Sequence, residues 1–223
     1  MAKYTKEQAI QIITDCAKKY KDELLDKTLL FICIDKHKNI FCYEFSFYIW
    51  NFMHLTGVKT KLYNSDIREH TNEKTQTISA VEFYNKCLSH KLSPSDFEFS
   101  DDGTTHMKLD VLPSVLCKNL AANMVGAYNS SKPKLYTEKI AGGIKACMGF
   151  VIDNIQGKYV PNTILKEDIR KNVFDYLRVL AVCRKNINDQ TYEEVTYKAK
   201  KINWDDIKYP NEFSYLHTII NDG

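Results

Sequence analysis

Side chains that can move protons or hold a phosphate are the first guide to the chemistry open to this chain of 223 residues. Six histidines are present. The segment 104–108 places two hydroxyls, the imidazole of His106 and an amine close together, and such groups can bind a phosphate. A polar cluster that directly follows Asp101-Asp-Gly103 is usually a solvated loop, so this segment also has a plain structural interpretation.

Other kinds of site leave no trace in the sequence. There is no Gly-rich phosphate loop, Gly-x-Ser-x-Gly turn, His-Glu-x-x-His pair or string of metal-binding carboxylates. The seven cysteines are odd in number and scattered, and no two stand at metal-ligand spacing. We therefore expect no cofactor, metal or disulfide, and reduced thiols of this kind are typical of a cytoplasmic protein.

Charge and composition indicate an ordinary globular protein. Lys and Arg number 31 against 28 Asp and Glu, a net charge of +3, which argues against a histone-like binder. Hydrophobic residues make up 44% of the chain and charged residues 26%. The apolar runs fall short of the ~18 to 20 residues of a membrane span, and the first residues lack the apolar centre of a signal peptide. We expect a cytoplasmic protein with no membrane partner.

The elements that must position the chemical groups change character along the chain. Apolar residues at steps of three and four predict helices from Lys6 to about Leu25, from Ser79 to about His90 and from Val111 to about Tyr128. Residues 28–35 and 39–49 are rich in β-forming residues and are joined by a polar turn, which predicts a hairpin.

The second half of the chain reads as short strands. Asn129-Ser-Ser-Lys-Pro133 combines turn formers and is the clearest internal boundary. The predicted elements beyond it are strands at 134–140, 145–153, 158–164, 173–183 and 192–200, with a short helix at 166–171. The expected fold class is α+β, in which an N-terminal helix, a hairpin and further helices precede a small antiparallel sheet. The expected domains are 1–130 and 131–223, or one continuous domain.

Positive charge is concentrated on the predicted sheet. Residues 132–201 hold 14 Lys and Arg against 8 Asp and Glu, a balance of +6, whereas residues 1–131 hold 16 of each. The last segment, 202–223, is slightly acidic and carries several large apolar side chains. We expect these apolar side chains to dock the segment on the rest of the protein.

Several short stretches are familiar when they are taken together. They are Asn51-Phe-Met-His-Leu-Thr-Gly57, Tyr136-Thr-Glu-Lys139, Gly149-Phe150, Tyr159-Val-Pro-Asn-Thr163 with Glu167-Asp-Ile-Arg170, and Val179-Leu-Ala-Val-Cys-Arg-Lys185 followed by Tyr192-Glu-Glu-Val-Thr-Tyr197. They resemble the phage-type nuclease-like family of the Barnase, EndoU, Colicin and RelE fold, in its fourth subfamily. The resemblance implies a protein of a phage or other mobile element, with a small sheet whose concave face carries basic and hydroxyl residues acting on RNA. A fold alone does not establish an activity.

The resemblance also suggests which residues would do the chemistry. Metal-free RNA cleavage needs a base for the 2'-hydroxyl, an acid for the leaving 5'-oxygen and a cation for the charge that develops on the phosphate. The family-like positions that could fill these roles are His54, Lys139, Thr163, Arg170 and Lys185. His54 is the leading general acid or base, although a histidine in so apolar a run is more often a core or capping residue. The charged residues are also expected on the polar side of a half-exposed sheet, and Thr163 could cap a helix.

A second group of residues could bind the substrate. It consists of Thr56, Lys59, Tyr136, Tyr159 and Tyr192. Thr56 and Lys59 follow His54 closely, and tyrosines can stack on the bases of single-stranded RNA. Tyrosines in strands also make ordinary cross-strand pairs.

Three hypotheses about function follow. In the first, a phage or mobile-element protein binds RNA and, if its site is active, cleaves it by metal-independent acid–base chemistry. In the second, the same sheet has no activity and acts as an inhibitor or counter-defence factor that binds a host protein or nucleoprotein. In the third, the Tyr- and Phe-rich faces of two copies meet in a homodimer.

Overall fold

The computed structural model describes residues 4–60, 78–129, 135–154 and 156–222. Its helices are α1 (Lys6–Glu23), α2 (Asn51–Thr56), α3 (Ala80–Leu88), α4 (Thr104–Val115) and α5 (Leu216–Asp222), with 3-10 helices η1 (Ile169–Lys171), η2 (Trp204–Asp206) and η3 (Asn211–Phe213). Its strands are β1 (Lys27–Ile34), β2 (Ile40–Phe47), β3 (Lys59–Thr60), β4 (Phe97–Glu98), β5 (Met124–Tyr128), β6 (Lys139–Gly142), β7 (Cys147–Asp153), β8 (Lys158–Leu165), β9 (Val173–Asn186) and β10 (Glu194–Lys198).

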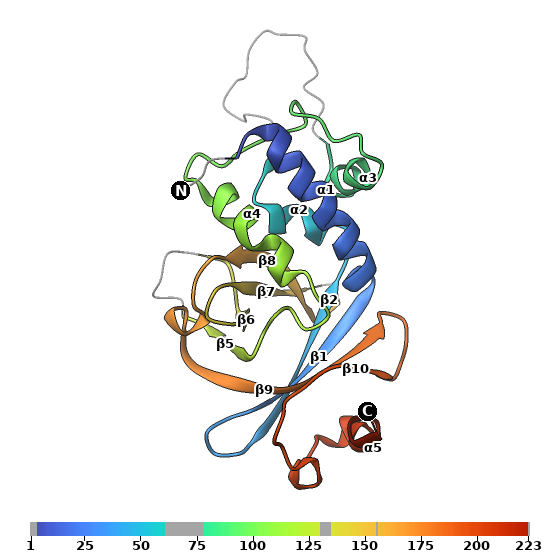
Figure 1. Ribbon diagram of the computed structural model, residues 1–223. Helices are drawn as coiled ribbons and strands as arrows, with labels where there is room; N and C mark the ends of the chain where they lie inside the picture. Colours follow the sequence, from blue (N-terminus) through green and yellow to red (C-terminus); the bar gives the residue numbers. More distant parts are fainter. Residues whose placement is uncertain (1–3, 61–77, 130–134, 155, 223) are drawn as a thin grey trace.

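Seven strands form a closed, mixed barrel in the order β1-β2-β8-β7-β6-β5-β9, and the pairing of β1 with β9 closes it (Figure 1). The neighbouring strands are antiparallel except β2 and β8, which meet in parallel where Phe45 lies opposite Tyr159. β10 extends the sheet outside the ring by pairing with β9. β3 and β4 form a separate two-stranded sheet.

The predicted small antiparallel sheet in the second half is therefore wrong. The N-terminal hairpin of β1 and β2 is inserted between β9 and β8, so strands from both sides of residue 130 share one sheet. This closure is possible because β9 has 14 residues. Its first part pairs with β5 and its second part with β1, while β2 pairs with β8, so both edges of the hairpin have a partner. The division into domains near residue 130 stays a prediction.

The predicted helix from Val111 to Tyr128 is also wrong in its extent. α4 begins earlier, at Thr104, and ends at Val115, and the chain then enters strand β5. Leu120 and Ala121 adopt positive φ angles of 56° and 48°, which no right-handed helix accommodates. The apolar residues after Val115 therefore belong to a turn and to strand β5, not to a helix.

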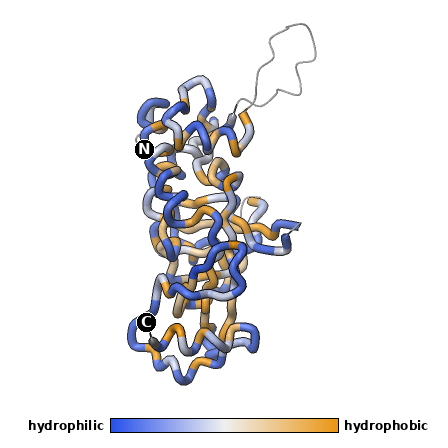
Figure 2. The backbone as a smooth tube through the Cα atoms, turned by 90° about the vertical axis from the view of Figure 1, so that its right-hand side faces the viewer, coloured by the Kyte–Doolittle hydropathy of each residue, from blue (hydrophilic) through white to orange (hydrophobic). Residues whose placement is uncertain are grey.

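The barrel interior and the helices above it share one apolar core. Phe45 packs edge-on against Phe31 with ring centroids 5.3 Å apart, and against Phe150 at 4.1 Å. Figure 1 shows α1, α2, α3 and α4 gathered at one end of the molecule and α5 at the other. Figure 2 shows hydrophobic residues concentrated along the middle of the molecule, where the strands lie. The helices therefore close one end of the barrel with their apolar faces.

The C-terminal segment covers part of the outer surface of the barrel. Its residues Trp204, Leu216 and Ile220 pack in a second core with buried residues of β1 and β9, such as Leu30 and Leu180. This packing confirms the expected docking of the last segment. Among the helices that the structure describes, none combines the length and the apolar composition needed to cross a membrane.

Candidate functional site

The stretch 51–57, which carries His54, forms helix α2 and its end. The helix stops at Gly57, whose φ of 72° lies in the left-handed region that glycine adopts easily. α4 then binds the freed carbonyl groups: Lys108 Nζ donates to His54 O at 2.9 Å, and Thr105 Oγ1 donates to Gly57 O at 2.6 Å. Ser100 Oγ also donates to Gly57 O, at 3.1 Å. The family-like stretch is thus the C-terminal end of a helix, anchored by α4.

The predicted residues in this stretch differ in access. His54 is exposed as a residue, but partial burial of its imidazole and the positive charge of Lys108 lower its pKa, which favours the neutral form. Thr56 is fully buried and its hydroxyl donates to Met53 O at 2.7 Å, so it has a capping role and does not face solvent. Lys59 is exposed, with its amine 3.9 Å from Asp101.

A cavity of about 600 Å³ lies between α4, the end of β8 and the turn before β9. Its polar lining includes Thr104 and Lys108 of α4, Thr163 of β8, Lys166, and Asn172. Apolar side chains line more of its surface than polar ones. Cavities of roughly 300 to 1,000 Å³ with a few convergent polar groups are typical of small-ligand sites, so this cavity has room for a nucleotide.

Lys108 is the unusual charge in this cavity. Its side chain is buried, with 7% of the residue exposed, and burial lowers its pKa to about 8. The ammonium donates to the end of α2, where the carbonyl dipoles favour a cation. Near neutral pH part of the population therefore carries a neutral amine beside the cavity, and this amine could accept a proton from a ligand.

A polar network adjoins the same cavity. Asp110 accepts from Tyr4 Oη at 2.5 Å and forms an ion pair with Lys166 Nζ at 2.5 Å. These contacts lower the pKa of Asp110, and the hydrogen bond to Asp110 raises the pKa of Tyr4. His106 accepts at Nδ1 from the backbone N–H of Tyr4, at 3.2 Å, so its imidazole is held beside the network. The ion pair holds the amine of Lys166 at the rim of the cavity.

Three other predicted residues of the second half do not line the larger cavity, and each contacts a different neighbouring side chain. Lys139 Nζ lies 4.6 Å from the centre of the Tyr43 ring, and burial lowers its pKa. Arg170 is exposed and binds Asp168 through Nε at 3.0 Å and Nη2 at 2.5 Å. The ring of Tyr159 packs 5.9 Å from that of Phe45. These contacts are the ordinary structural roles that such residues have in sheets and turns.

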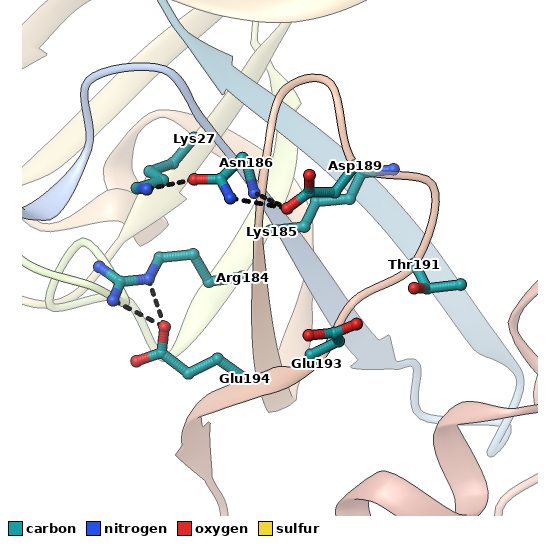
Figure 3. A pocket seen from close by; sticks show the side chains of 8 residues that line it. All are labelled: Lys27, Arg184, Lys185, Asn186, Asp189, Thr191, Glu193 and Glu194. Carbon is teal, nitrogen blue, oxygen red and sulfur yellow. Dashed lines mark hydrogen bonds and ion pairs between the residues drawn. The ribbon is translucent and has the colours of Figure 1, made fainter.

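Lys185 lines a second, smaller pocket of about 180 Å³ beside the turn between β9 and β10 (Figure 3). The charges in this pocket largely satisfy one another. Arg184 pairs with Glu194 at 2.6 Å, and Lys27 donates to Asn186, which in turn donates to Asp189. Its volume lies below the roughly 300 Å³ at which small-ligand sites begin, so this pocket is too small for a nucleotide.

Tyr192 next to this pocket is a structural residue. It is 1% exposed, and its hydroxyl donates to Glu44. The amine of Lys185 lies 4.7 Å from the centre of its ring. By contrast, Tyr136 is 76% exposed.

Of the five predicted catalytic residues, only Thr163 lines the larger cavity. Lys108, Lys166 and Asn172 also line it, and of these the sequence pattern had drawn attention only to Lys108, as part of the polar cluster at 104–108. The helical spacing of Thr104 and Lys108, four residues apart, places them on one face of α4 and could have indicated a shared site. In the described ranges no group of three or more His, Cys, Asp or Glu side chains could hold a metal ion.

Neither a curated protein nor a solved structure gives a significant match. One family model, described as phage-Barnase-EndoU-ColicinE5/D-RelE like nuclease4, matches residues 12–201. The match begins within α1 and ends after β10. It therefore includes the whole barrel and the residues that line the larger cavity. Because it covers most of the chain, the protein belongs to this nuclease-like phage family.

Proposed function

We propose that the protein binds RNA and cleaves it without a metal ion, with the cavity between α4 and β8 as the reaction site. The observation that carries this proposal is the buried amine of Lys108 in a cavity with room for a nucleotide. Membership of a nuclease-like family supports the class of reaction. The positive balance of residues 132–201 supports a polyanionic substrate.

The chemistry needs one proton acceptor, one proton donor and one cation. In the proposed reaction the neutral amine of Lys108 takes the proton of the 2'-hydroxyl, and the 2'-oxygen attacks phosphorus. The bond from phosphorus to the 5'-oxygen breaks, which leaves a 2',3'-cyclic phosphate on one product. The 5'-oxygen takes a proton from water or from the Lys166 ammonium, whose charge also stabilises the phosphate in the transition state.

The test is incubation of labelled single-stranded RNA with the purified protein in EDTA. We expect Lys108→Met and Lys166→Ala to lower the cleavage rate by about 100-fold or more, as loss of an acid–base group typically does. Lys145→Ala is the matched control, because Lys145 is an exposed lysine in the turn between β6 and β7 and its loss changes the net charge equally. Equal rates in all four proteins would overturn the assignment of the cavity.

A second candidate function is supported by the dispersal of the predicted catalytic residues. His54, Lys139, Arg170 and Lys185 engage different structural partners and do not line one cavity. A chain of this family without an active site could act as an inhibitor that binds a host protein. Intact RNA without retained binding, together with a stable host-protein complex that persists in His54→Ala, would favour this function.

A further inference from the structure

The start of β9 exposes aromatic rings that a barrel strand normally packs away. Phe174 is 78% exposed and Tyr176 is 49% exposed. β1 pairs with β9 only from Arg178 onward, where it lies opposite Ile34. Within the described residues the segment 173–177 therefore has a strand partner, β5, on one side alone. On β5 the residue opposite Tyr176 is Gly126, which has no side chain to cover the ring.

Arginines flank these rings. Arg178 lies two residues after Tyr176 in unbroken register with β5, so the two side chains share a face of the strand, and both are exposed. Arg170 lies in η1, four residues before Phe174, and is also exposed. Asp168 holds the Arg170 guanidinium from one side. We call Arg170, Phe174, Tyr176 and Arg178 the aromatic–arginine surface.

This surface adjoins the larger cavity. Asn172, which lines the cavity, lies between Arg170 and Phe174 in the chain. Its carbonyl accepts from the backbone N–H of Asn129, at 2.8 Å, which ties it to the end of β5. A further exposed aromatic residue, Tyr136, directly follows Leu135, another lining residue. In each of two segments, 135–136 and 172–174, a residue that lines the cavity is thus followed in the chain by an exposed aromatic residue.

We infer that the aromatic–arginine surface binds single-stranded RNA by stacking unpaired bases on Phe174 and Tyr176 while Arg170 and Arg178 contact phosphates. This inference rests on the proposed function, because it places the nucleotides next to the one in the cavity. Exposed rings stack on unpaired bases, whereas the bases of a duplex are already stacked within it. Residues 168–178 carry three cationic and two acidic side chains. Stacking therefore contributes more to the affinity than charge does.

Binding of a short labelled RNA, measured by fluorescence anisotropy, tests this inference; its 2'-hydroxyls are methylated so that the proposed reaction cannot cleave it. We expect Phe174→Ala and Tyr176→Ala each to weaken binding of the single strand between about 5-fold and about 100-fold. Phe174→Leu keeps apolar area but loses the ring, so it should weaken binding similarly, whereas Phe174→Trp should preserve it. Ile144→Ala is the matched control, since Ile144 is 61% exposed and lies outside the surface. Binding of the same sequence as a duplex should change little.

The contribution of the arginines has its own readout. In Arg170→Gln/Arg178→Gln, the slope of log Kobs against log salt should fall by roughly 1.4, the value for two phosphate contacts on a single strand. An unchanged slope would show that these arginines do not contact the phosphates of the RNA.

A dinucleotide substrate helps to separate this inference from the proposed function, because it is the shortest RNA with a phosphodiester bond to cleave and at most one of its nucleotides lies outside the cavity. Suppose that the dinucleotide is cleaved and that Phe174→Ala and Tyr176→Ala bind the longer RNA as tightly as the wild type. This result would overturn RNA binding by the aromatic–arginine surface and would leave the proposed reaction site standing. If these variants bind the single strand more weakly, but the wild type cleaves neither the dinucleotide nor a longer RNA, the surface is supported and the proposed cleavage reaction is overturned. Normal binding by Phe174→Leu would show that base stacking is absent and would point to a protein partner for these apolar residues.

Discussion

The amine of Lys108 titrates in an environment unlike that of a surface lysine. Burial lowers its pKa to about 8, while in the unfolded chain it returns to the ordinary value of 10.5. Between these values the unfolded chain binds a proton that the folded protein has lost, so the contribution of Lys108 to stability rises with pH. Below about pH 8 both states are protonated, and the cost of burying the charge is fully present.

Lys108→Met removes this pH dependence. The free energy of unfolding of the wild type, relative to that of Lys108→Met, should rise by ~2 kcal/mol between about pH 7.5 and about pH 9.5. Urea unfolding of both proteins across this range measures the difference, and the titration of the other groups cancels in the comparison. A difference that stays constant with pH would show that Lys108 has an ordinary pKa.

The cysteines should differ in their reactivity. Burial raises the pKa values of six of them: Cys16, Cys33, Cys42, Cys87, Cys147 and Cys183. Cys117, in the turn after α4, is half-buried. Thiolates are the reactive form, so we expect a thiol-specific reagent to modify Cys117 first under native conditions. Mass spectrometry of the labelled protein locates the site, and Cys117→Ser should abolish the fast phase; a fast phase that persists in this variant would contradict the assignment.

At the scale of elements, the approach of β6 to β7 depends on a glycine. Gly142 lies opposite Cys147, and a Cβ atom there would come within 2.5 Å of Ala146 O. The backbones cannot accept this contact without moving apart. Gly142→Ala should therefore lower the free energy of unfolding by about 1 to 3 kcal/mol, as overpacking of a core typically does.

The neighbouring glycine provides the control for this substitution. A Cβ atom on Gly143 would meet its nearest neighbour, Ala121 O, at 3.4 Å, an ordinary contact distance. Gly143→Ala should leave stability almost unchanged in the same urea experiment. Equal stability of the two variants would mean that β6 and β7 do not approach as closely as described.

At the scale of the whole molecule, the C-terminal segment completes the outer surface of the barrel. Leu30, Ile32 and Leu180 of the barrel are at most 1% exposed. They pack in the second core with Trp204, Leu216 and Ile220 of this segment. Lys198 Nζ donates to Ile220 O at 2.5 Å, and Tyr215 Oη accepts a hydrogen bond from the backbone N–H of Tyr192 at 3.0 Å. The segment lies beyond the last residue matched by the family, Lys201.

Removal of residues 202–223 should therefore uncover an apolar face. We expect the shortened protein to bind a hydrophobic dye, to melt at a lower temperature and to self-associate, because exposed apolar patches of this kind drive association. Leu216→Ala is a milder version and should cost about 2 to 5 kcal/mol. Sedimentation reports the association, and the same experiment on the intact chain tests the predicted homodimer. A truncated monomer with the original melting temperature would show that the segment contributes nothing.

Local pattern alone identified much of this protein. The spacing of apolar residues predicted α1 and α3 within a few residues of their ends, and turn residues located the β1–β2 hairpin, because these features depend on neighbours in the chain. The stretch 51–57 and the family-like strands were sufficient to suggest the family, since that comparison also reads the chain in order.

The tertiary structure alone decided how the sheet closes and which groups meet. Pairing of β1 with β9 joins segments about 150 residues apart, and hydrophobic periodicity carries no information about partners at that distance. Lys108 appeared in the sequence as one lysine of a polar cluster, and its lowered pKa arises only when α2 and α4 pack over it. The same packing that sealed the end of the barrel thereby set both the shape of the cavity and the charge beside it.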